Sequence, residues 1–185
     1  MLEANLISYN FKLLLLSQIV LVDEQDRETG TMEKMEVHYK GILHRAFSIF
    51  IFNDRGEMLL QQRAGKKYHS GGLWTNACCS HPLQNEVIED AALRRLQEEM
   101  GFTTPIKKAF TFTYKADVGD GLIEHEFDHV FTGLFNGTVV PAEDEVQDFC
   151  YMSLPAITSA LESHPHKYTQ WFKIAFPKIQ DYLTI

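Results

Sequence analysis

The apolar run from Ala46 to Phe52 (AFSIFIF) constrains the fold of this chain more than any other stretch. Its aromatic and β-branched residues predict a buried strand. The Asn-Asp-Arg-Gly sequence at 53–56 predicts a turn directly after that strand. Residues 57–62 then supply the second arm of a hairpin. We therefore expect a β-sheet that buries this strand.

Residues 85–100 show the clearest helix pattern. Asn85 is placed to cap the amino end of this helix, and Gly101 is placed to end it. Acidic side chains near the start favour the positive end of the helix dipole: Glu86, Glu89 and Asp90. Apolar residues recur at every fourth position and predict the stripe that faces the core: Ile88, Ala92, Leu96 and Met100.

The rest of the chain predicts further strands and two closing helices. Strands are expected over 18–22, 110–114, 124–135 and 148–152, and helices over 156–163 and 168–182, the last kinked or interrupted at Pro177. Residues 64–73 predict a loop. We expect one domain over 1–185, because no repeat or low-complexity linker divides the chain. Helices set around a mixed sheet indicate an α/β or α+β sandwich rather than a doubly wound fold.

The charge and the cysteines exclude several classes of protein. The net charge of -8 argues against nucleic acid or an anionic membrane as a partner. Three cysteines, two of them adjacent, suit reduced thiols in the cytoplasm: Cys78, Cys79 and Cys150. Residues 11–16 are apolar but too short to span a bilayer, and they lack the marks of a signal peptide. We expect a cytoplasmic protein whose residues 1–17 form an extension of unassigned role.

A thiol and an imidazole lie close together in the segment 74–82 (WTNACCSHP). In an extended segment, Cys79 and His81 project to the same side. A cysteine titrates near ~8.5, so suitable neighbours would let it act as an acid or base near neutral pH. Buried free cysteines are also common as small core residues. Sequence periodicity alone does not choose between Cys78 and Cys79.

Three carboxylates alternate along the strand expected at 124–135. Glu124, Glu126 and Asp128 project to one face of that strand. Their mutual repulsion requires a metal, another cation or water on that face. A solvated strand face is the alternative, and spacing alone does not decide between the two.

Three histidines could complete a metal site with two of these carboxylates. His38 and His44 are expected in or beside a loop before the first long strand, and His81 follows the cysteines. Imidazole and carboxylate together suit a divalent transition metal. Each histidine taken alone is more often a surface residue or a satisfied core residue. The pattern assigns no role to His69, His164 or His166.

The helix segment resembles the signature of Nudix hydrolases, Gly-x5-Glu-x7-Arg-Glu-U-x-Glu-Glu-x-Gly-U, in which U is bulky and apolar. Ser80 replaces the first glycine, and Arg95 replaces a glutamate that binds the water-activating metal in those enzymes. An arginine there weakens metal-assisted hydrolysis, adds a cation for phosphate and can pair with Glu99. A solvated charged helix face is the alternative. The matching positions are Glu86, Arg94, Leu96, Glu98, Glu99, Gly101 and Phe102.

Beyond this helix, the chain resembles type I isopentenyl-diphosphate isomerase from about residue 30 to residue 171. The block Trp-Thr-Asn-x-Cys-x-His-Pro at 74–82 is the most specific part of the resemblance. The other matching positions are Thr31-Met-Glu-Lys34, His38, His44-Arg-Ala-Phe47, Gln62-Arg63-Ala64, Lys67, Arg94-Arg95, Glu99, Tyr114, Glu124-x-Glu126 and Trp171.

The resemblance implies a Nudix-like fold and the interconversion of isopentenyl and dimethylallyl diphosphate in isoprenoid precursor synthesis. Cys79 and Glu126 correspond to the catalytic pair, on opposite sides of the five-carbon unit, with Tyr114 assisting the carboxylate. The resemblance thus makes Cys78 the packing residue. A transition-metal ion, Mn²⁺ or Zn²⁺, corresponds to a site of five ligands: His38, His44, His81, Glu124 and Glu126.

The resemblance also implies how the diphosphate is held. Glu99 corresponds to the ligand of a Mg²⁺ ion that bridges to the diphosphate. Trp171, and in a weaker correspondence Trp74, would stabilise a carbocation-like intermediate through the ring faces. The phosphate-binding positions are Lys34, Arg63, Lys67 and Arg95. Two other functions compete with this one: a Nudix hydrolase of a nucleoside or other diphosphate, and a non-catalytic diphosphate-binding or metal-sensing protein.

Overall fold

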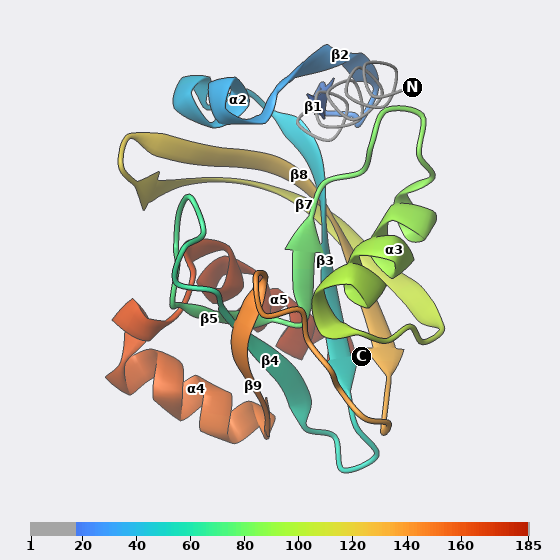
Figure 1. Ribbon diagram of the computed structural model, residues 1–185, viewed down its shortest axis with the longest axis vertical. Helices are drawn as coiled ribbons and strands as arrows, with labels where there is room; N and C mark the ends of the chain where they lie inside the picture. Colours follow the sequence, from blue (N-terminus) through green and yellow to red (C-terminus); the bar gives the residue numbers. More distant parts are fainter. Residues whose placement is uncertain (1–17, 185) are drawn as a thin grey trace, which may run out of the picture.

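A computed structural model describes residues 18–184 of the chain, and Figure 1 shows their arrangement. The apolar run at 11–16 and the expected extension over 1–17 lie outside the described residues. The strands are β1 (Gln18–Val22), β2 (Glu28–Glu33), β3 (His44–Phe52), β4 (Met58–Arg63), β5 (Trp74–Asn76), β6 (Cys78–Ser80), β7 (Ile106–Gly119), β8 (Leu122–Leu134) and β9 (Val146–Met152). The helices are α2 (Lys34–Lys40), α3 (Ile88–Met100), α4 (Leu154–Ser163), a 3-10 turn (Pro165–Lys167) and α5 (Gln170–Leu183).

Strand β3 organises one mixed sheet, as the apolar run predicts. It pairs antiparallel with β1, β4 and β6, and parallel with β8. Strand β8 forms a long hairpin with β7, and β4 pairs with both β5 and β9. The turn at 53–56 is confirmed, because Phe52 lies opposite Met58. A mixed sheet with helices around it confirms the α+β class.

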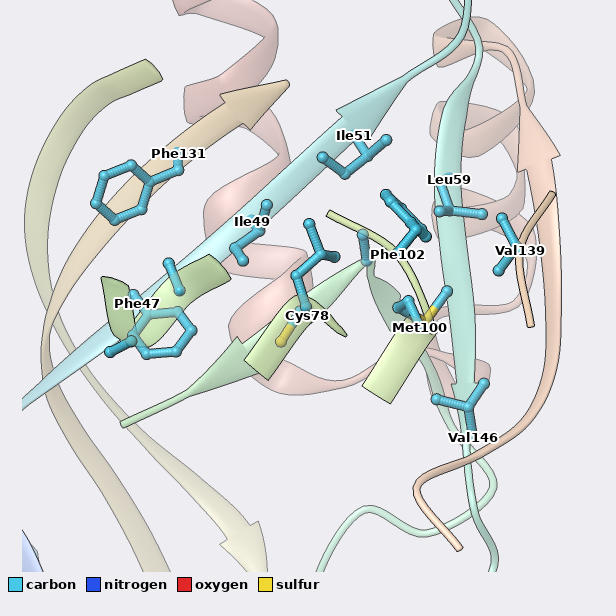
Figure 2. Close-up of a cluster of buried hydrophobic side chains, with 14 residues drawn as sticks. Phe47, Ile49, Ile51, Leu59, Cys78, Met100, Phe102, Phe131, Val139 and Val146 are labelled. Carbon is cyan, nitrogen blue, oxygen red and sulfur yellow. The ribbon is translucent and has the colours of Figure 1, made fainter. Parts of the chain in front are cut away.

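Two apolar cores lie on opposite faces of β3. Phe47, Ile49 and Ile51 pack with the apolar stripe of α3, as Figure 2 shows for part of this cluster. Phe50 and Phe52 face the other way and pack with α5. The predicted stripe of α3 is confirmed: Ala92, Leu96 and Met100 are buried, with Ile88 packed against them.

The predicted start of α3 is wrong. The helix begins at Ile88, its N-cap is Val87, and no side chain caps it. Asn85 instead takes a left-handed backbone conformation (φ 64°) in the preceding turn. Glu86 lies before the helix, where its carboxylate accepts the Leu83 amide at 2.8 Å and pairs with Arg94. This carboxylate therefore stabilises the turn before the helix and is not part of the first helical turn.

The predicted interruption at Pro177 is also absent, since α5 runs from Gln170 through Pro177 to Leu183 as one helix. Thr169 caps its amino end, accepting the Phe172 amide at 3.4 Å. Trp171, Phe172 and Phe176 are buried on its inner face. Tertiary packing of that face outweighs the one backbone hydrogen bond that a proline removes.

The sequence patterns do not predict several of the short elements. Strand β2 and helix α2 are two elements that no sequence pattern predicts. His44 begins β3 directly beside the short connection at 41–43, as expected, whereas His38 lies on α2. The sequences of β2 and α2 lack the periodicity that marks longer elements. Among the described residues, no helix is long and apolar enough to cross a bilayer.

Candidate active site

Strand register aligns three of the predicted site residues in one row. His44 on β3 lies opposite Glu126 on β8, and Glu126 lies opposite Tyr114 on β7. Residues directly opposite one another in a sheet project to the same face. All three side chains therefore point to the α5 side of the sheet and are buried there. The alternative of a solvated strand face is wrong for Glu124, Glu126 and Asp128, which are all buried.

The pairing of β6 with β3 separates the two adjacent cysteines. Cys79 lies opposite Ser48, and Cys78 lies opposite Ile49. Cys78 is fully buried in the apolar core beside α3. Cys79 faces the α5 side, where it lines a cavity. The register thus places one thiol in the core and the other at the candidate site.

A network of polar side chains contacts the Cys79 thiol. The thiol donates to Asn76 Oδ1 at 2.9 Å and lies 3.5 Å from Ser48 Oγ. The Asn76 amide nitrogen donates to two backbone carbonyls, those of Ile49 and Cys78, which fixes the direction of its oxygen. Burial and the nearby Asp128 raise the pKa of Cys79 well above its ordinary value. The thiol therefore keeps its proton at neutral pH.

Two imidazoles present a free nitrogen to the same place. Nδ1 of His38 lies 2.7 Å from the Lys34 carbonyl oxygen, and Nδ1 of His44 lies 2.8 Å from that of Ile42. A carbonyl only accepts, so each Nδ1 carries the proton and each Nε2 keeps its lone pair. Both Nε2 atoms are buried and lack a hydrogen-bond partner among residues 18–184. A buried, unpartnered lone pair is costly unless a cation binds it.

These lone pairs belong to a set of ligands that suits a metal. Donor atoms of His38, His44, His81 and Glu126 all lie within 4.8 Å of one another. A second group, with donors equally close, joins His38 to His69 and Glu124. Imidazoles supported by backbone carbonyls, together with carboxylates, fit a divalent transition metal.

Tyr114 bridges the two carboxylates. Its hydroxyl lies 2.8 Å from Glu124 Oε2 and 2.7 Å from Glu126 Oε2. One hydroxyl proton can serve only one of the two oxygens at a time. Burial and the neighbouring Glu126 raise the pKa of Glu124 well above its usual range. Burial opposes ionisation of Glu126 too, but the neighbouring imidazoles of His44 and His81 outweigh it and hold its pKa well below the usual range.

His69 is the metal-type ligand that the sequence patterns missed. It is buried in the loop between β4 and β5, with its Nε2 3.4 Å from Glu124 Oε1. Burial and the nearby Arg63 lower its pKa to about 2, so the ring is neutral. No periodic pattern marks a lone histidine in a Gly-, Lys- and Ser-rich loop. His164 and His166 are exposed and take no part in the cavity lining.

Four cations line the cavity beside the thiol and the carboxylates. They come from separate elements: Lys34, Arg63, Lys67 and Arg95. Burial lowers the pKa of Lys34 to about 8, helped by the charges of the other three cations. Cations held this close need an anion among them.

Glu99 lies at the edge of this basic cluster. Its carboxylate accepts the Arg95 guanidinium at 2.6 Å and the Gln61 amide at 3.0 Å. The predicted pairing of Arg95 with Glu99 is therefore confirmed. Glu145, which the sequence analysis did not single out, forms ion pairs with both Lys67 and Arg95. In the described residues, no group of three metal-type ligands includes Glu99.

Trp171 closes the cavity from α5. It is 3% exposed, and its indole nitrogen has no hydrogen-bond partner in the part of the chain that the structure describes. The Arg63 guanidinium carbon lies 5.1 Å from its ring centroid. Its ring meets His69 edge-on at 5.7 Å. Trp74, in contrast, packs in the core beside α5 and is not among the residues that line this cavity.

The fold matches a known class of proteins. Residues 42–172 match the NUDIX domain. A solved structure from Deinococcus radiodurans superposes with a TM-score of 0.67 at 13% identity, covering 80% of this chain and 90% of that one. That likeness concerns the fold alone. The chain is a NUDIX-domain protein.

Two curated relatives narrow the class. A protein from Pectobacterium atrosepticum named isopentenyl-diphosphate Delta-isomerase is 49% identical over 90% of this chain and 93% of its own length. Another from Aromatoleum aromaticum, named isopentenyl-diphosphate Delta-isomerase 2, is 48% identical over 88% of this chain and 86% of its own length. The chain therefore belongs to the isopentenyl-diphosphate Delta-isomerase family.

Proposed function

We propose that this protein interconverts isopentenyl diphosphate and dimethylallyl diphosphate. One observation supports the proposal above the rest: a thiol, a carboxylate pair and four cations line a single cavity closed by an indole ring. The relatives that carry this activity in their names cover most of the chain. The product would serve isoprenoid synthesis in the cytoplasm, with no nucleic acid or membrane as partner.

The reaction moves one double bond and needs one proton added and one removed. Cys79 and Glu126 would exchange these protons on opposite sides of the five-carbon unit, and the chain ends with its proton count unchanged. A protonated Cys79 and an ionised Glu126 are the complementary states for this exchange. Tyr114 would donate its hydrogen bond to the carboxylate side, alternating between two oxygens that lie at nearly equal distances.

The basic cluster would bind the diphosphate. Arg63 and Arg95 offer planar donors, while Lys34 and Lys67 offer point charges. Glu99 would hold a Mg²⁺ ion, which would offset the negative charge of the diphosphate. Binding would require Arg95 and Lys67 to turn from Glu145 toward the phosphates.

A transition-metal ion, Mn²⁺ or Zn²⁺, would occupy the buried imidazole and carboxylate cluster. His38, His44, His81, Glu124 and Glu126 would hold it. The ion would offset the repulsion between the two carboxylates, which burial otherwise makes costly. The unpartnered Nε2 atoms of His38 and His44 support this assignment.

Trp171 would protect a cation-like intermediate. A ring face next to developing positive charge contributes about 1–2 kcal/mol when water is excluded. The indole is buried, so it also keeps water from trapping such a cation.

Hydrolysis is disfavoured by Arg95. This residue lies where hydrolases of this fold have a metal-binding glutamate, and its ion pair with Glu99 would weaken metal binding there.

The test is incubation of purified, metal-replete protein with isopentenyl diphosphate and Mg²⁺ in deuterated water. We expect dimethylallyl diphosphate to form and deuterium to enter the five-carbon unit. Release of inorganic phosphate or of a mononucleotide from a diphosphate substrate, without isomerisation, would identify a hydrolase instead. Tight binding of isopentenyl diphosphate without turnover would identify a non-catalytic binding protein.

A further inference from the structure

His69 lies against the metal-type cluster from a side that the family resemblance does not describe. Its loop is held by backbone hydrogen bonds, including those of Arg63 with Leu73 and Gly72. Gly71 packs so tightly that a Cβ there would come within 2.5 Å of the Gly65 carbonyl oxygen. The loop therefore has one compact course, and the His69 side chain, 2% exposed, points inward from it.

The His69 Nε2 atom faces the Glu124 Oε1 atom, and the two form no hydrogen bond. Its Nδ1 lies 3.2 Å from Ser70 Oγ, which can accept a hydrogen bond from that nitrogen. In that tautomer, Nε2 carries a lone pair and faces Glu124 Oε1 at 3.4 Å. A metal ion between the two atoms would bind both of them.

The spacing matches that of two ligands on one ion. Metal–nitrogen and metal–oxygen bonds of ~2.1 Å place neighbouring ligands of an octahedral ion ~3 Å apart. Glu124 and His69 are separated by 3.4 Å, and Glu126 Oε1 lies 3.1 Å from His81 and 3.5 Å from His44. The His69 pair therefore has the same geometry as the pairs already assigned to the metal.

His38 belongs to both groups of ligands, and its Nδ1 already donates to the Lys34 carbonyl. Only Nε2 remains, and one lone pair binds one ion, so the two groups cannot each hold an ion through His38. The donor atoms of the two groups do not all lie within 4.8 Å of one another. One ion bound through His38 would therefore draw the side chains of Glu124 and His69 toward the other group.

We propose that His69 is a sixth protein ligand of the transition-metal ion, beside the five that the family resemblance implies. The inference rests on the proposed metal site. Four imidazole nitrogens and two carboxylate oxygens form an octahedral set, which suits Mn²⁺ or Fe²⁺ better than a tetrahedral Zn²⁺ ion. The side chain also contacts Trp171, so the metal would tie the β4–β5 loop to the α5 wall of the cavity.

The test uses Co²⁺ alone, without substrate, and counts ligands directly. In proton NMR of the Co²⁺ form, each coordinated imidazole gives one strongly shifted ring N–H signal that disappears in deuterated water. We expect four such signals and one Co²⁺ per chain in the unmodified protein. His69→Ala should show three signals, still one ion per chain, and an affinity about 10–100-fold weaker by calorimetry.

Controls separate this inference from the site on which it rests. His125 lies between Glu124 and Glu126 but faces away, toward the Gly41 carbonyl, so His125→Gln should keep all four signals. His44→Ala should bind Co²⁺ far more weakly. Three signals in the unmodified protein, or two ions per chain, would overturn the role of His69 alone. Failure of the unmodified protein to bind Co²⁺ would overturn the metal site as well. The count in the unmodified protein stands even if a variant fails to fold.

Discussion

The two faces of strand β3 differ in almost everything except burial. On the α3 face, Phe47, Ile49 and Ile51 belong to one apolar cluster (Figure 2). On the α5 face, His44 and Ser48 alternate into a buried polar region before Phe50 resumes an apolar core. The difference shows that one strand can serve stability on one side and chemistry on the other. Substitutions on the two faces should therefore alter different measurements.

The adjacent cysteines should give the largest contrast. Cys79→Ala removes the proposed proton donor, and we expect kcat to fall by about 10²–10⁴-fold. Cys78→Ala leaves a small cavity in the α3-side core, and we expect a loss of roughly 1 kcal/mol of stability with little change in kcat. Steady-state kinetics and urea unfolding of both variants measure the two effects. A loss of activity in Cys78→Ala at intact fold would contradict the division.

Leu96→Ala should act on the α3 side alone. Leu96 is fully buried in the core that α3 forms with β3. Truncation should lower the free energy of unfolding by about 2–5 kcal/mol, because the surroundings fill the cavity only in part. Urea unfolding measures this loss. The affinity for Co²⁺ should stay near its original value, and a tenfold loss of affinity would indicate that the two faces are coupled.

Ser48→Ala tests the polar face without removing a reacting group. Ser48 donates to Asp128 at 2.7 Å, and the other oxygen of that buried carboxyl has no partner among the described residues. Removing this donor should cost about 1–3 kcal/mol of stability. The thiol keeps its bond to Asn76, so kcat should fall much less than in Cys79→Ala. A fall in kcat as large as that of Cys79→Ala would mean that Ser48 takes part in proton transfer.

The pH dependence of diphosphate binding should give the smallest effect. Lys34 has a pKa of about 8, lowered from 10.5 by burial and by the other cations. Above pH 8 it loses its charge, so KM should rise by up to ~10-fold per pH unit. Lys34→Arg keeps its charge and should give a flat profile. Stability should change in the opposite sense: between pH 8 and 10.5 the unfolded chain holds more protons, so the free energy of unfolding rises with pH.

Much of the fold can be predicted from local patterns, and each prediction that fails has a physical reason. The run at 46–52 and the stripe through Leu96 specify β3 and α3 because strand and helix periods are visible in sequence. Asn85 is a residue type that often caps helices. In the structure, Glu86 instead accepts the Leu83 amide in the preceding turn, and the helix begins at Ile88. Helix α2 is too short to show a period, so its position was missed.

The candidate site divides in the same way. The alternation along β8 predicts that Glu124 and Glu126 share a face, and specific spacing identifies the block at 74–82. Contacts between distant segments are not written in any local pattern. Glu145 directly precedes β9, and the pairing of β9 with β4 brings it to Lys67 and Arg95.

The types of chemical group, the residues that share a strand face and the family can be read from the chain alone, because covalent spacing and periodicity are local properties. Periodicity does not choose between Cys78 and Cys79. The register of β6 on β3 turns Cys79 toward the cavity, in agreement with the family resemblance. The position of His69 beside Glu124 follows from the fold, because a compact loop carries that side chain across to another strand. Such placements depend on packing between segments far apart in the chain, which no single segment specifies.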